Sequence, residues 1–240
     1  SDWYMRQMMK KVNDADALPI NIDPEKIKDG VRDVIYYYDY QIPGNVDLQT
    51  ALEVMLSDEP ENKMQTQSGE SMNILPTKNL KLQVDKQAVL ANKAVPTMWQ
   101  DSIVDSLTFT YPMGYVSRAE LSVLSVLANN NWKRPIYFTT TTPQQFYLGL
   151  DKYLISEGFA LRLVPVNTNV EDAEQGAIQD TDAVYDKIMN KYKFGNISNS
   201  KYLDPDTYRY LTFYTSSIFG ETAQNLLQEG KKKEAHDVVL

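Results

Sequence analysis

Short segments in which apolar or aromatic residues alternate with polar ones recur in the first half of the chain. A period of two separates the side chains of a strand onto its two faces, so such segments predict strands. Two of them are expected, at residues 80–84 and 107–111, and the aromatic, β-rich run at 34–40 predicts a third strand by its composition. The intervening segment 57–72 is polar and has no period, and it predicts a mobile loop.

Apolar residues spaced three and four apart follow recognisable helix starts. Asp23-Pro24 places a capping carboxylate before a proline, which predicts a short helix. Asp47 precedes a helix with apolar residues on one side. Ser117 and Glu120 have the spacing of a capping box, and they open an apolar helix that is expected to lie against a sheet.

The clearest structural unit spans residues 129–166. It predicts a strand at 134–140, a helix that begins at Thr142 and ends at Gly158, and a second strand at 159–166. If both strands share a sheet, the crossover helix makes them parallel neighbours. The fold class expected is therefore α/β, with at least one parallel strand–helix–strand unit flanked by helices and a helical C-terminal part.

Composition divides the chain into three parts. Residues 1–166 are expected to form the α/β domain, and the acidic segment 167–181 a linker or long loop. Residues 182–240 predict a helical tail. Within it, 219–235 has the spacing of a single tetratricopeptide-like hairpin, although two packed helices would explain the same pattern equally well.

Charge and composition exclude several classes of function. The 240 residues have a net charge of -8, which argues against nucleic acid or anionic lipid as the main partner. The chain has no cysteine, so disulfides, cysteine nucleophiles and zinc–thiolate sites are excluded. No apolar run approaches the ~20 residues of a membrane span, and Ser1-Asp2-Trp3 starts abruptly, as expected for a piece of a longer protein.

Motifs for catalysis, metals or cofactors are not evident in the sequence. There is no Gly-x-Ser-x-Gly elbow, phosphate loop or dinucleotide fingerprint. The only histidine, His236, lies next to a lysine run and predicts a surface position. Carboxylates such as Asp101 and Asp105 could serve acid–base or Ca²⁺ chemistry, but solvated surface charge explains them more simply. We expect no catalytic residue, no metal and no cofactor.

Thr140, Thr141 and Thr142 form one candidate ligand contact. They follow a predicted strand and precede a predicted helix, a place where free backbone N–H groups attract ligands. The simpler explanation is that Thr142 caps the helix and the other two are β-branched strand residues.

Tyr36 and Tyr38 form the second candidate ligand contact. With their tyrosine neighbours they supply enough amphipathic rings for a sugar-stacking platform. A half-buried strand would use the same residues, so both interpretations stay open.

Three segments resemble a known family. They are Asp2-Trp3-Tyr4, the run Asn129–Phe138 with Trp-Lys-Arg-Pro-Ile-Tyr-Phe, and Tyr147–Pro165 with Tyr-Leu-Gly-Leu. Together they resemble the C-terminal extracytoplasmic region of a bacterial multi-spanning membrane-protein family. Its members look like protein O-mannosyltransferases of the glycosyltransferase C type, and the family was long labelled a domain of unknown function.

The resemblance implies a periplasmic domain attached to a membrane-embedded parent chain that holds the catalytic acids. The chain would then recognise or position an acceptor protein or glycan without being catalytic alone. The alternative is a structural or protein-interaction module that has no glycan role and contacts a partner through residues 182–240. A third hypothesis is an independent carbohydrate hydrolase that uses a carboxylate pair, but the spacing of the carboxylates along the sequence singles out no such pair.

Overall fold

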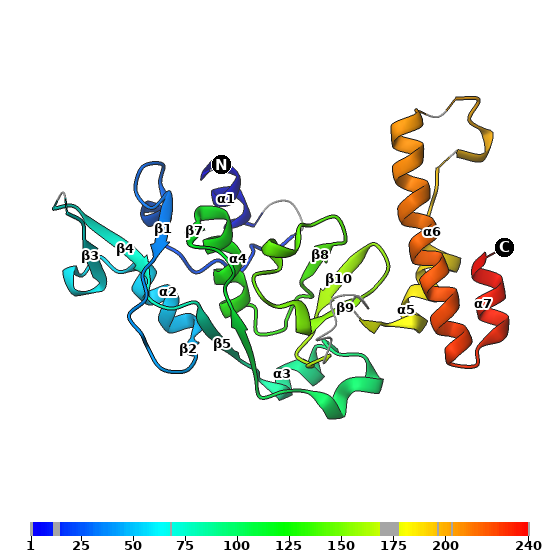
Figure 1. Cartoon of the computed structure of the whole chain (residues 1–240), viewed down its shortest axis with the longest axis horizontal. Helices are drawn as coiled ribbons and strands as arrows, with labels where there is room; N and C mark the ends of the chain where they lie inside the picture. Colours follow the sequence, from blue (N-terminus) through cyan, green and yellow to red (C-terminus); the bar gives the residue numbers. More distant parts are fainter. Residues whose placement is uncertain are drawn as a thin grey trace. The chain divides into compact units, whose positions relative to one another are not determined.

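The chain forms two compact units in a computed structural model (Figure 1). The model describes residues 2–11, 15–67, 69–168, 178–195, 197–202 and 204–239. Unit 1 comprises Ser1–Pro135, Pro143–Leu150 and Pro165–Asn167, and unit 2 comprises Ile136–Thr142, Asp151–Val164 and Thr168–Leu240. The domain limits expected from composition stay predictions, and most of the expected linker lies outside the described residues.

Unit 1 combines helices with two sheets. Its α-helices are α1 (Asp2–Met8), α2 (Leu48–Leu56), α3 (Lys86–Ala91) and α4 (Arg118–Asn129), and its 3₁₀ turns are η1 (Pro24–Ile27), η2 (Pro60–Asn62), η3 (Thr97–Ser102) and η4 (Gln144–Tyr147). Its strands are β1 (Val34–Tyr37), β2 (Val46–Asp47), β3 (Lys63–Gln65), β4 (Ser71–Leu75), β5 (Asn79–Gln83), β6 (Ser106–Thr110) and β7 (Tyr115–Ser117). The predicted strands at 34–40, 80–84 and 107–111 are confirmed by β1, β5 and β6.

The two sheets of unit 1 share one crossover helix. The first has the strand order β3-β4-β1-β7, and the second has the order β2-β5-β6. β1 pairs in parallel with β4, and β2 pairs in parallel with β5. α2 lies between the partners of both pairs along the chain. Parallel strand–helix–strand arrangements are therefore present, although not in residues 129–166 where one was predicted, and the α/β class is confirmed.

α2 forms where its sequence predicts it. The Asp47 carboxylate accepts a hydrogen bond from the Gln49 N–H at 2.9 Å, which caps the first turn. Leu48, Leu52 and Met55 are buried along one side of the helix. Each large apolar side chain so buried stabilises the fold by roughly 1.5–3 kcal/mol. The capping box predicted at Ser117 is also confirmed, at the start of α4.

Unit 2 joins a small sheet to a helical tail. The sheet has the order β11-β9-β10-β8, and the tail includes a π-helical turn, η6. The bounds are β8 (Tyr137–Thr139), η5 (Asp151–Tyr153), β9 (Leu154–Ser156), β10 (Ala160–Leu163), β11 (Ile178–Gln179), α5 (Thr181–Asp186), η6 (Lys187–Lys191), η7 (Ile197–Asn199), α6 (Pro205–Gln228) and α7 (Lys232–Val239).

A separate core holds the helical tail together. Val184, Leu226 and Val238 are among its buried residues and come from α5, α6 and α7. α6 ends in a Schellman motif, in which Lys231 N–H donates to the Leu226 carbonyl at 2.8 Å and Gly230 N–H to that of Leu227 at 3.1 Å. The predicted helix–glycine–helix pattern is thus present. In the described part of the chain, no helix combines the length and apolarity needed to cross a bilayer.

The helix predicted from Thr142 to Gly158 is wrong. The segment instead forms the short 3₁₀ turns η4 and η5, separated by Leu148 and Gly149, which both have positive φ. A Cβ on Gly149 would lie 2.2 Å from the Thr110 carbonyl oxygen. The chain therefore passes directly against the Thr110 backbone of β6, and this close approach breaks the helical path that the periodicity predicted.

The two strands of that segment are antiparallel, not parallel. β10 pairs with β8 in the register Leu161 to Phe138, and also with β9. Gly158 does not end a helix. It turns the β9–β10 hairpin with a φ of +89°, and an added Cβ would lie 2.2 Å from the Tyr192 hydroxyl oxygen. Only glycine fits both the backbone angle and this contact.

The loop predicted at 57–72 is also largely wrong. It contains η2 and the antiparallel pair β3–β4, with Met64 opposite Met72. Lys63 pairs with Asn73, whose side chain donates to the Ser57 carbonyl at 2.6 Å. The hydrophobic pattern did not predict this hairpin because most of its residues are polar. Hydrogen bonds and two methionines stabilise it.

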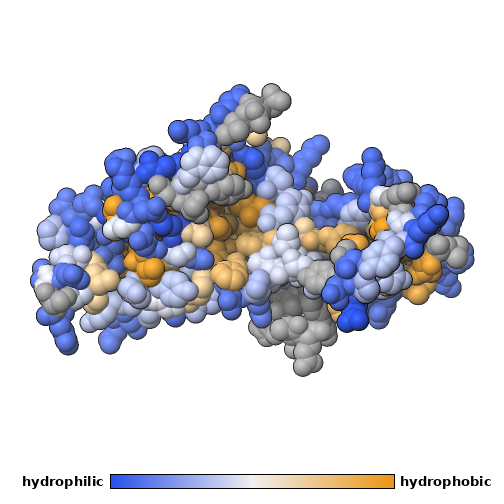
Figure 2. Space-filling model, turned by 90° about the horizontal axis from the view of Figure 1, so that it is seen from above, coloured by the Kyte–Doolittle hydropathy of each residue, from blue (hydrophilic) through white to orange (hydrophobic). Residues whose placement is uncertain are grey.

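Hydrophilic residues cover much of the face shown in Figure 2, and hydrophobic residues gather in patches among them. This distribution is ordinary for a folded protein in water. It leaves individual polar and aromatic clusters as the features that can indicate a function.

Gly149→Ala tests the close approach between η4 and β6. We expect it to lower the free energy of unfolding of unit 1 by at least about 2 kcal/mol more than Gly30→Ala. Gly30 has nearly the same φ, +82° against +81°, but an added Cβ would meet no atom within 4 Å. All three tryptophans, Trp3, Trp99 and Trp132, lie in unit 1, so tryptophan fluorescence during urea unfolding measures the effect. Equal destabilisation by the two substitutions would contradict the prediction.

Candidate functional site

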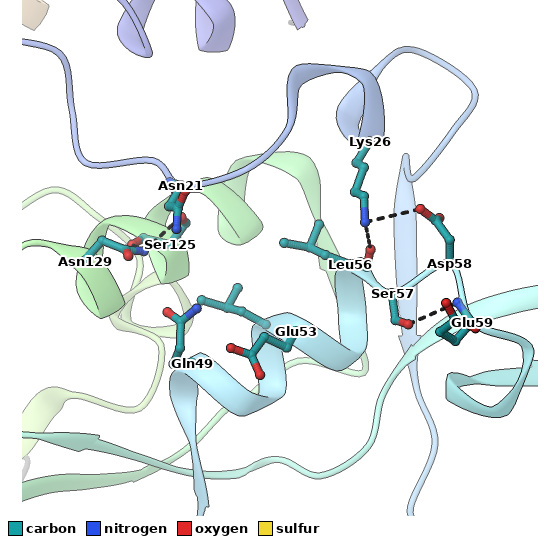
Figure 3. Close-up of a pocket in the computed structure, with 11 residues that line it drawn as sticks. Asn21, Lys26, Gln49, Glu53, Leu56, Ser57, Asp58, Glu59, Ser125 and Asn129 are labelled. Atoms are coloured by element: carbon teal, nitrogen blue, oxygen red, sulfur yellow. Dashed lines mark hydrogen bonds and ion pairs between the residues drawn. The ribbon is translucent and has the colours of Figure 1, made fainter.

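A polar pocket of about 430 Å³ lies beside α2 in unit 1 (Figure 3). Its volume is within the range of small-molecule sites. The wall combines amides, carboxylates, one ammonium group and two leucines. The lining residues are Asn21, Lys26, Gln49, Leu52, Glu53, Leu56, Ser57, Asp58, Glu59, Ser125 and Asn129.

Two cations from outside α2 bind its C-terminal end, and one of them, Lys26, lines the pocket. α2 has no basic residue in its last turn, although its terminal carbonyls favour positive charge. Lys26 Nζ donates to the Leu56 carbonyl at 2.7 Å. Arg32, only 5% exposed, donates to the carbonyls of Leu56 at 3.4 Å and Ser57 at 3.2 Å. These contacts fix the C-terminal end of α2 relative to η1.

Asp58 bridges the two cations. One carboxylate oxygen accepts from Arg32, and the other lies 3.2 Å from Lys26 Nζ. The hydrogen bonds from Arg32 and then from Lys26 lower the pKa of the Asp58 carboxyl. Asp58 is therefore ionised at neutral pH, and both cations are already engaged within the protein.

Amide side chains line the opposite end. Ser125 Oγ accepts a hydrogen bond from the Asn21 backbone N–H at 3.0 Å, and Asn129 Nδ2 donates to the Ser125 carbonyl at 2.8 Å. Figure 3 shows the side chains of Gln49 and Glu53 side by side on α2. Within the described part of the chain, neither of these two side chains forms a hydrogen bond or ion pair, so both are available to a ligand.

This lining suits a neutral, hydroxyl-rich ligand. An amide donates and accepts, and a carboxylate accepts, which together match vicinal hydroxyl groups. The leucine side chains offer apolar contact to a C–H face. Three carboxylates and a single ammonium group line the pocket, so an anionic ligand is disfavoured. In the described residues, no group of three or more histidine, aspartate or glutamate side chains is arranged to hold a metal ion.

Thr140, Thr141 and Thr142 lie in unit 2, at the end of β8. Thr139 Oγ1 lies 3.0 Å from the hydroxyl oxygens of Thr141 and Thr142, so these hydroxyls contact one another. η4 has no side-chain cap, and it is a four-residue turn rather than a long helix. The helix N-terminus that motivated this candidate is therefore not formed, and a ligand role for the three threonines stays a prediction.

Tyr36 and Tyr38 lie in unit 1, on or next to β1. They are 50% and 48% exposed, as a stacking platform requires. Residues on α2 line the pocket, and neither tyrosine is among them. The pocket thus does not include the two predicted tyrosines, and their ligand role stays a prediction.

A buried charge cluster in unit 2 centres on Glu157, which is 5% exposed. Arg162 Nη1 donates to its Oε1 at 3.1 Å, and the Tyr137 hydroxyl donates to its Oε2 at 3.1 Å. Lys187, in η6, donates to the same Oε2. Burial opposes ionisation of Glu157, but Lys187 and Arg162 outweigh it, so the pKa of this carboxyl is lowered.

The cluster connects the sheet of unit 2 to its helices. An ionised carboxylate held by two cations cannot easily take up a proton, so a general-base role is disfavoured. Its neighbour Asp180 caps α5 by accepting from the Ala183 N–H at 3.1 Å. The pKa of Asp180 is raised, mainly by burial and then by the charge of Glu157. We interpret this cluster as structural.

An apolar groove of about 360 Å³ lies along α6 in unit 2. Its lining includes the apolar or aromatic side chains of Phe194, Ile197, Tyr202, Tyr208 and Leu211, and the hydroxyl groups of Thr212 and Thr215. The groove falls within residues 182–240, where a protein partner was predicted. No described contact identifies such a partner.

Sequence patterns alone did not find the pocket. Its residues come from three separate segments, 21–26, 49–59 and 125–129, and only Asn129 belongs to a motif, the run Asn129–Phe138. One local signal was present: Gln49, Leu52, Glu53 and Leu56 are spaced three and four apart on one helical face. A mixed polar and apolar face at that spacing also describes any half-exposed helix, so the signal lacked specificity.

Comparison with known proteins gives one match. A family model described as TMEM260-associated domain 2 matches residues 1–183. The matched residues include the whole pocket and β1, and they end before α6 and α7. No curated protein and no solved structure matches the chain significantly.

Glu157→Gln tests the charge cluster through pH. Folding lowers the pKa of the Glu157 carboxyl. The stabilisation that the ionised carboxylate gives the folded state is therefore fully present above its unfolded pKa of about 4.3. It is lost as the pH falls through the pKa of Glu157 in the folded state. At neutral pH we expect the variant to be less stable by about 3 kcal/mol. The difference in the free energy of unfolding between wild type and variant should become smaller below about pH 4.

Far-UV circular dichroism at several pH values measures this difference, since α5, α6 and α7 lie in unit 2. Tryptophan fluorescence, which reports on unit 1, is the internal control and should not shift. A stability difference that is unchanged down to pH 3 would contradict the proposed linkage.

Proposed function

Because the chain belongs to the family of TMEM260-associated domain 2, we propose that it is an accessory domain of a membrane-embedded glycosyltransferase-like protein. In this proposal the membrane part performs the transfer reaction, and the present chain supplies no catalytic residue. The domain lies on the periplasmic side of the inner membrane, as the resemblance of its sequence implies. Its task is to recognise or position the acceptor, a glycan or a glycan-bearing protein.

One observation supports acceptor recognition: the polar pocket at the C-terminal end of α2. Gln49 and Glu53 present unused hydrogen-bonding groups there, beside the amides of Asn21 and Asn129. The cations at the other end are held by Asp58 and by the carbonyls of α2. A sugar residue would therefore meet amides and carboxylates on its hydroxyls and leucine on one face.

Pre-organisation strengthens this proposal. Lys26 and Arg32 fix the end of α2, and Ser125 fixes the segment that contains Asn21. Because the backbone around the pocket is already held in place, ligand binding needs to order only a few side chains, chiefly Gln49 and Glu53. Even so, the open, mostly solvated rim suits weak and transient binding, which is appropriate for an acceptor that must leave after transfer.

The second candidate function is a protein-interaction module with no glycan role. The apolar groove along α6 favours it, since Tyr208 and Leu211 are exposed there. This groove lies outside the matched residues 1–183. The two functions are separable, because glycan binding would depend on α2 and partner binding on α6.

Titration with methyl α-D-mannopyranoside and with N-acetylglucosamine tests the glycan role. We expect fast-exchange shifts of amide signals from α2 and α4 at millimolar sugar, measured by ¹H–¹⁵N NMR. Gln49→Ala and Glu53→Ala should each weaken binding about fivefold, because each removes about one hydrogen bond worth ~1 kcal/mol.

Gln87→Ala and Glu70→Ala are matched controls, since both side chains are exposed in unit 1 and outside the pocket. They should leave the affinity unchanged. Absence of shifts with every sugar at tens of millimolar would overturn glycan recognition by this pocket. Equal weakening by the controls would show that binding is not located there.

A further inference from the structure

A row of exposed tyrosines follows the central strand of the first sheet. Tyr36, Tyr38, Tyr40 and Tyr115 are 50%, 48%, 48% and 46% exposed. Ile35 and Val116, on the opposite face of the same strands, are buried. The sheet therefore has one core face and one tyrosine-bearing face, and we call these four rings the tyrosine row.

Strand register places the rings side by side. Tyr36 lies directly opposite Tyr115 in the antiparallel pair β1–β7, so their side chains project from the same face. Tyr36 and Tyr38 are alternate residues, which puts their Cα atoms about 7 Å apart along the strand direction. The rings of Tyr38 and Tyr40 contact edge to face, with centroids 5.3 Å apart.

The backbone beneath the tyrosine row is rigidly held. The Tyr37 N–H donates to the Gly114 carbonyl at 3.0 Å, and the Tyr38 N–H donates to that of Leu75 at 3.1 Å. From the core, the hydroxyl of the fully buried Tyr111 donates to the Tyr115 carbonyl at 3.0 Å. The platform thus exists before any ligand binds.

These features identify the kind of ligand. β1 is paired on both sides, by β4 and β7, so an extended peptide cannot add to it through backbone hydrogen bonds. The ligand must instead lie across the rings. Half-exposed tyrosines, rather than leucines or methionines, combine an apolar face with a hydroxyl, and they suit a flat ligand that has both C–H and O–H groups.

Charge disfavours two further classes of ligand. The tyrosine row itself is uncharged, and beside it the Lys78 ammonium group, 4.9 Å from the centroid of the Tyr37 ring, is offset by the Asp39 carboxylate. An anionic lipid surface or a phosphorylated ligand would need a cluster of basic residues at this place. A neutral carbohydrate needs none.

We propose that the tyrosine row is a stacking platform for a linear, neutral oligosaccharide, separate from the pocket beside α2. The pocket takes one sugar residue, whereas the row contacts several consecutive residues of a chain. This inference relies on the proposed function only for the class of ligand. The affinity of the domain would then depend on the length of the glycan as well as on the identity of a single sugar residue.

The test uses linear β-1,4-linked manno-oligosaccharides and cello-oligosaccharides, from disaccharide to hexasaccharide, titrated into the full chain. We expect affinity to rise with length, by about tenfold or more over the series. Tyr36→Ala and Tyr115→Ala should each remove most of this gain, a loss of about five- to tenfold for the hexasaccharide. Tyr36→Phe should retain most of it, because stacking needs the ring.

Phe213→Ala is the matched control and should change nothing, because Phe213 is an exposed aromatic residue of unit 2 that lines neither the pocket nor the groove along α6. A tryptophan-fluorescence unfolding curve that matches that of wild type shows that unit 1 of each variant is folded before denaturant is added. If Tyr36→Ala proves unstable, Tyr38→Ala combined with Tyr40→Ala tests the same platform beyond the end of β1.

The outcomes separate this inference from the proposed pocket. Affinity that is independent of length, or insensitive to the alanine substitutions, overturns the tyrosine row while monosaccharide binding by the pocket can persist. Length-dependent binding that survives Gln49→Ala and Glu53→Ala supports the row even if the pocket fails. Binding of unrelated extended peptides at equal affinity would also overturn the inference.

Discussion

The hydrogen bonds and ion pairs at the C-terminal end of α2 hold together the part of unit 1 that contains the candidate pocket. α2 is the crossover for both parallel strand pairs, yet its last turn has no cation of its own to satisfy the terminal carbonyls. Lys26 and Arg32 supply the donors, and Asp58 holds the two cations together. Because Asp58 and the α2 carbonyls engage both cations, the adjoining pocket keeps the Gln49 amide and the Glu53 carboxylate for a ligand.

Both proposed binding surfaces follow from how α2 and the first sheet bury their apolar residues. α2 buries Leu48 and Met55, which leaves Gln49 and Glu53 on the solvated side. β1 buries Ile35, which leaves the tyrosine row on the other face of the sheet. A sheet that needs one face for its core has the second face available for recognition.

Unit 2 is stabilised differently. Its helices share a small apolar core, and Glu157 connects them to the sheet through Lys187. Removing one partner from such a cluster leaves a buried charge without compensation, which costs more than the intact cluster contributes. The tail beyond residue 183 lies outside the family match, so its groove along α6 and the pocket of unit 1 need not share a function.

The sequence by itself determined the features that depend on neighbouring residues. Asp47 and Ser117 cap helices, the β-rich residues at 34–40 include β1, and Gly230 ends α6, because caps, strand propensity and glycine turns are local effects. The exposure of Tyr36 and Tyr38 also agreed with their alternation along the strand.

Tertiary structure decided the rest. The helix expected after Thr142 is interrupted because Gly149 packs against the Thr110 backbone, a contact between residues far apart in the chain. At the β9–β10 hairpin, Gly158 has a positive φ and packs against the Tyr192 hydroxyl, and the pocket exists because three segments meet beside α2. No local pattern encodes such contacts, since each depends on where the chain returns in three dimensions.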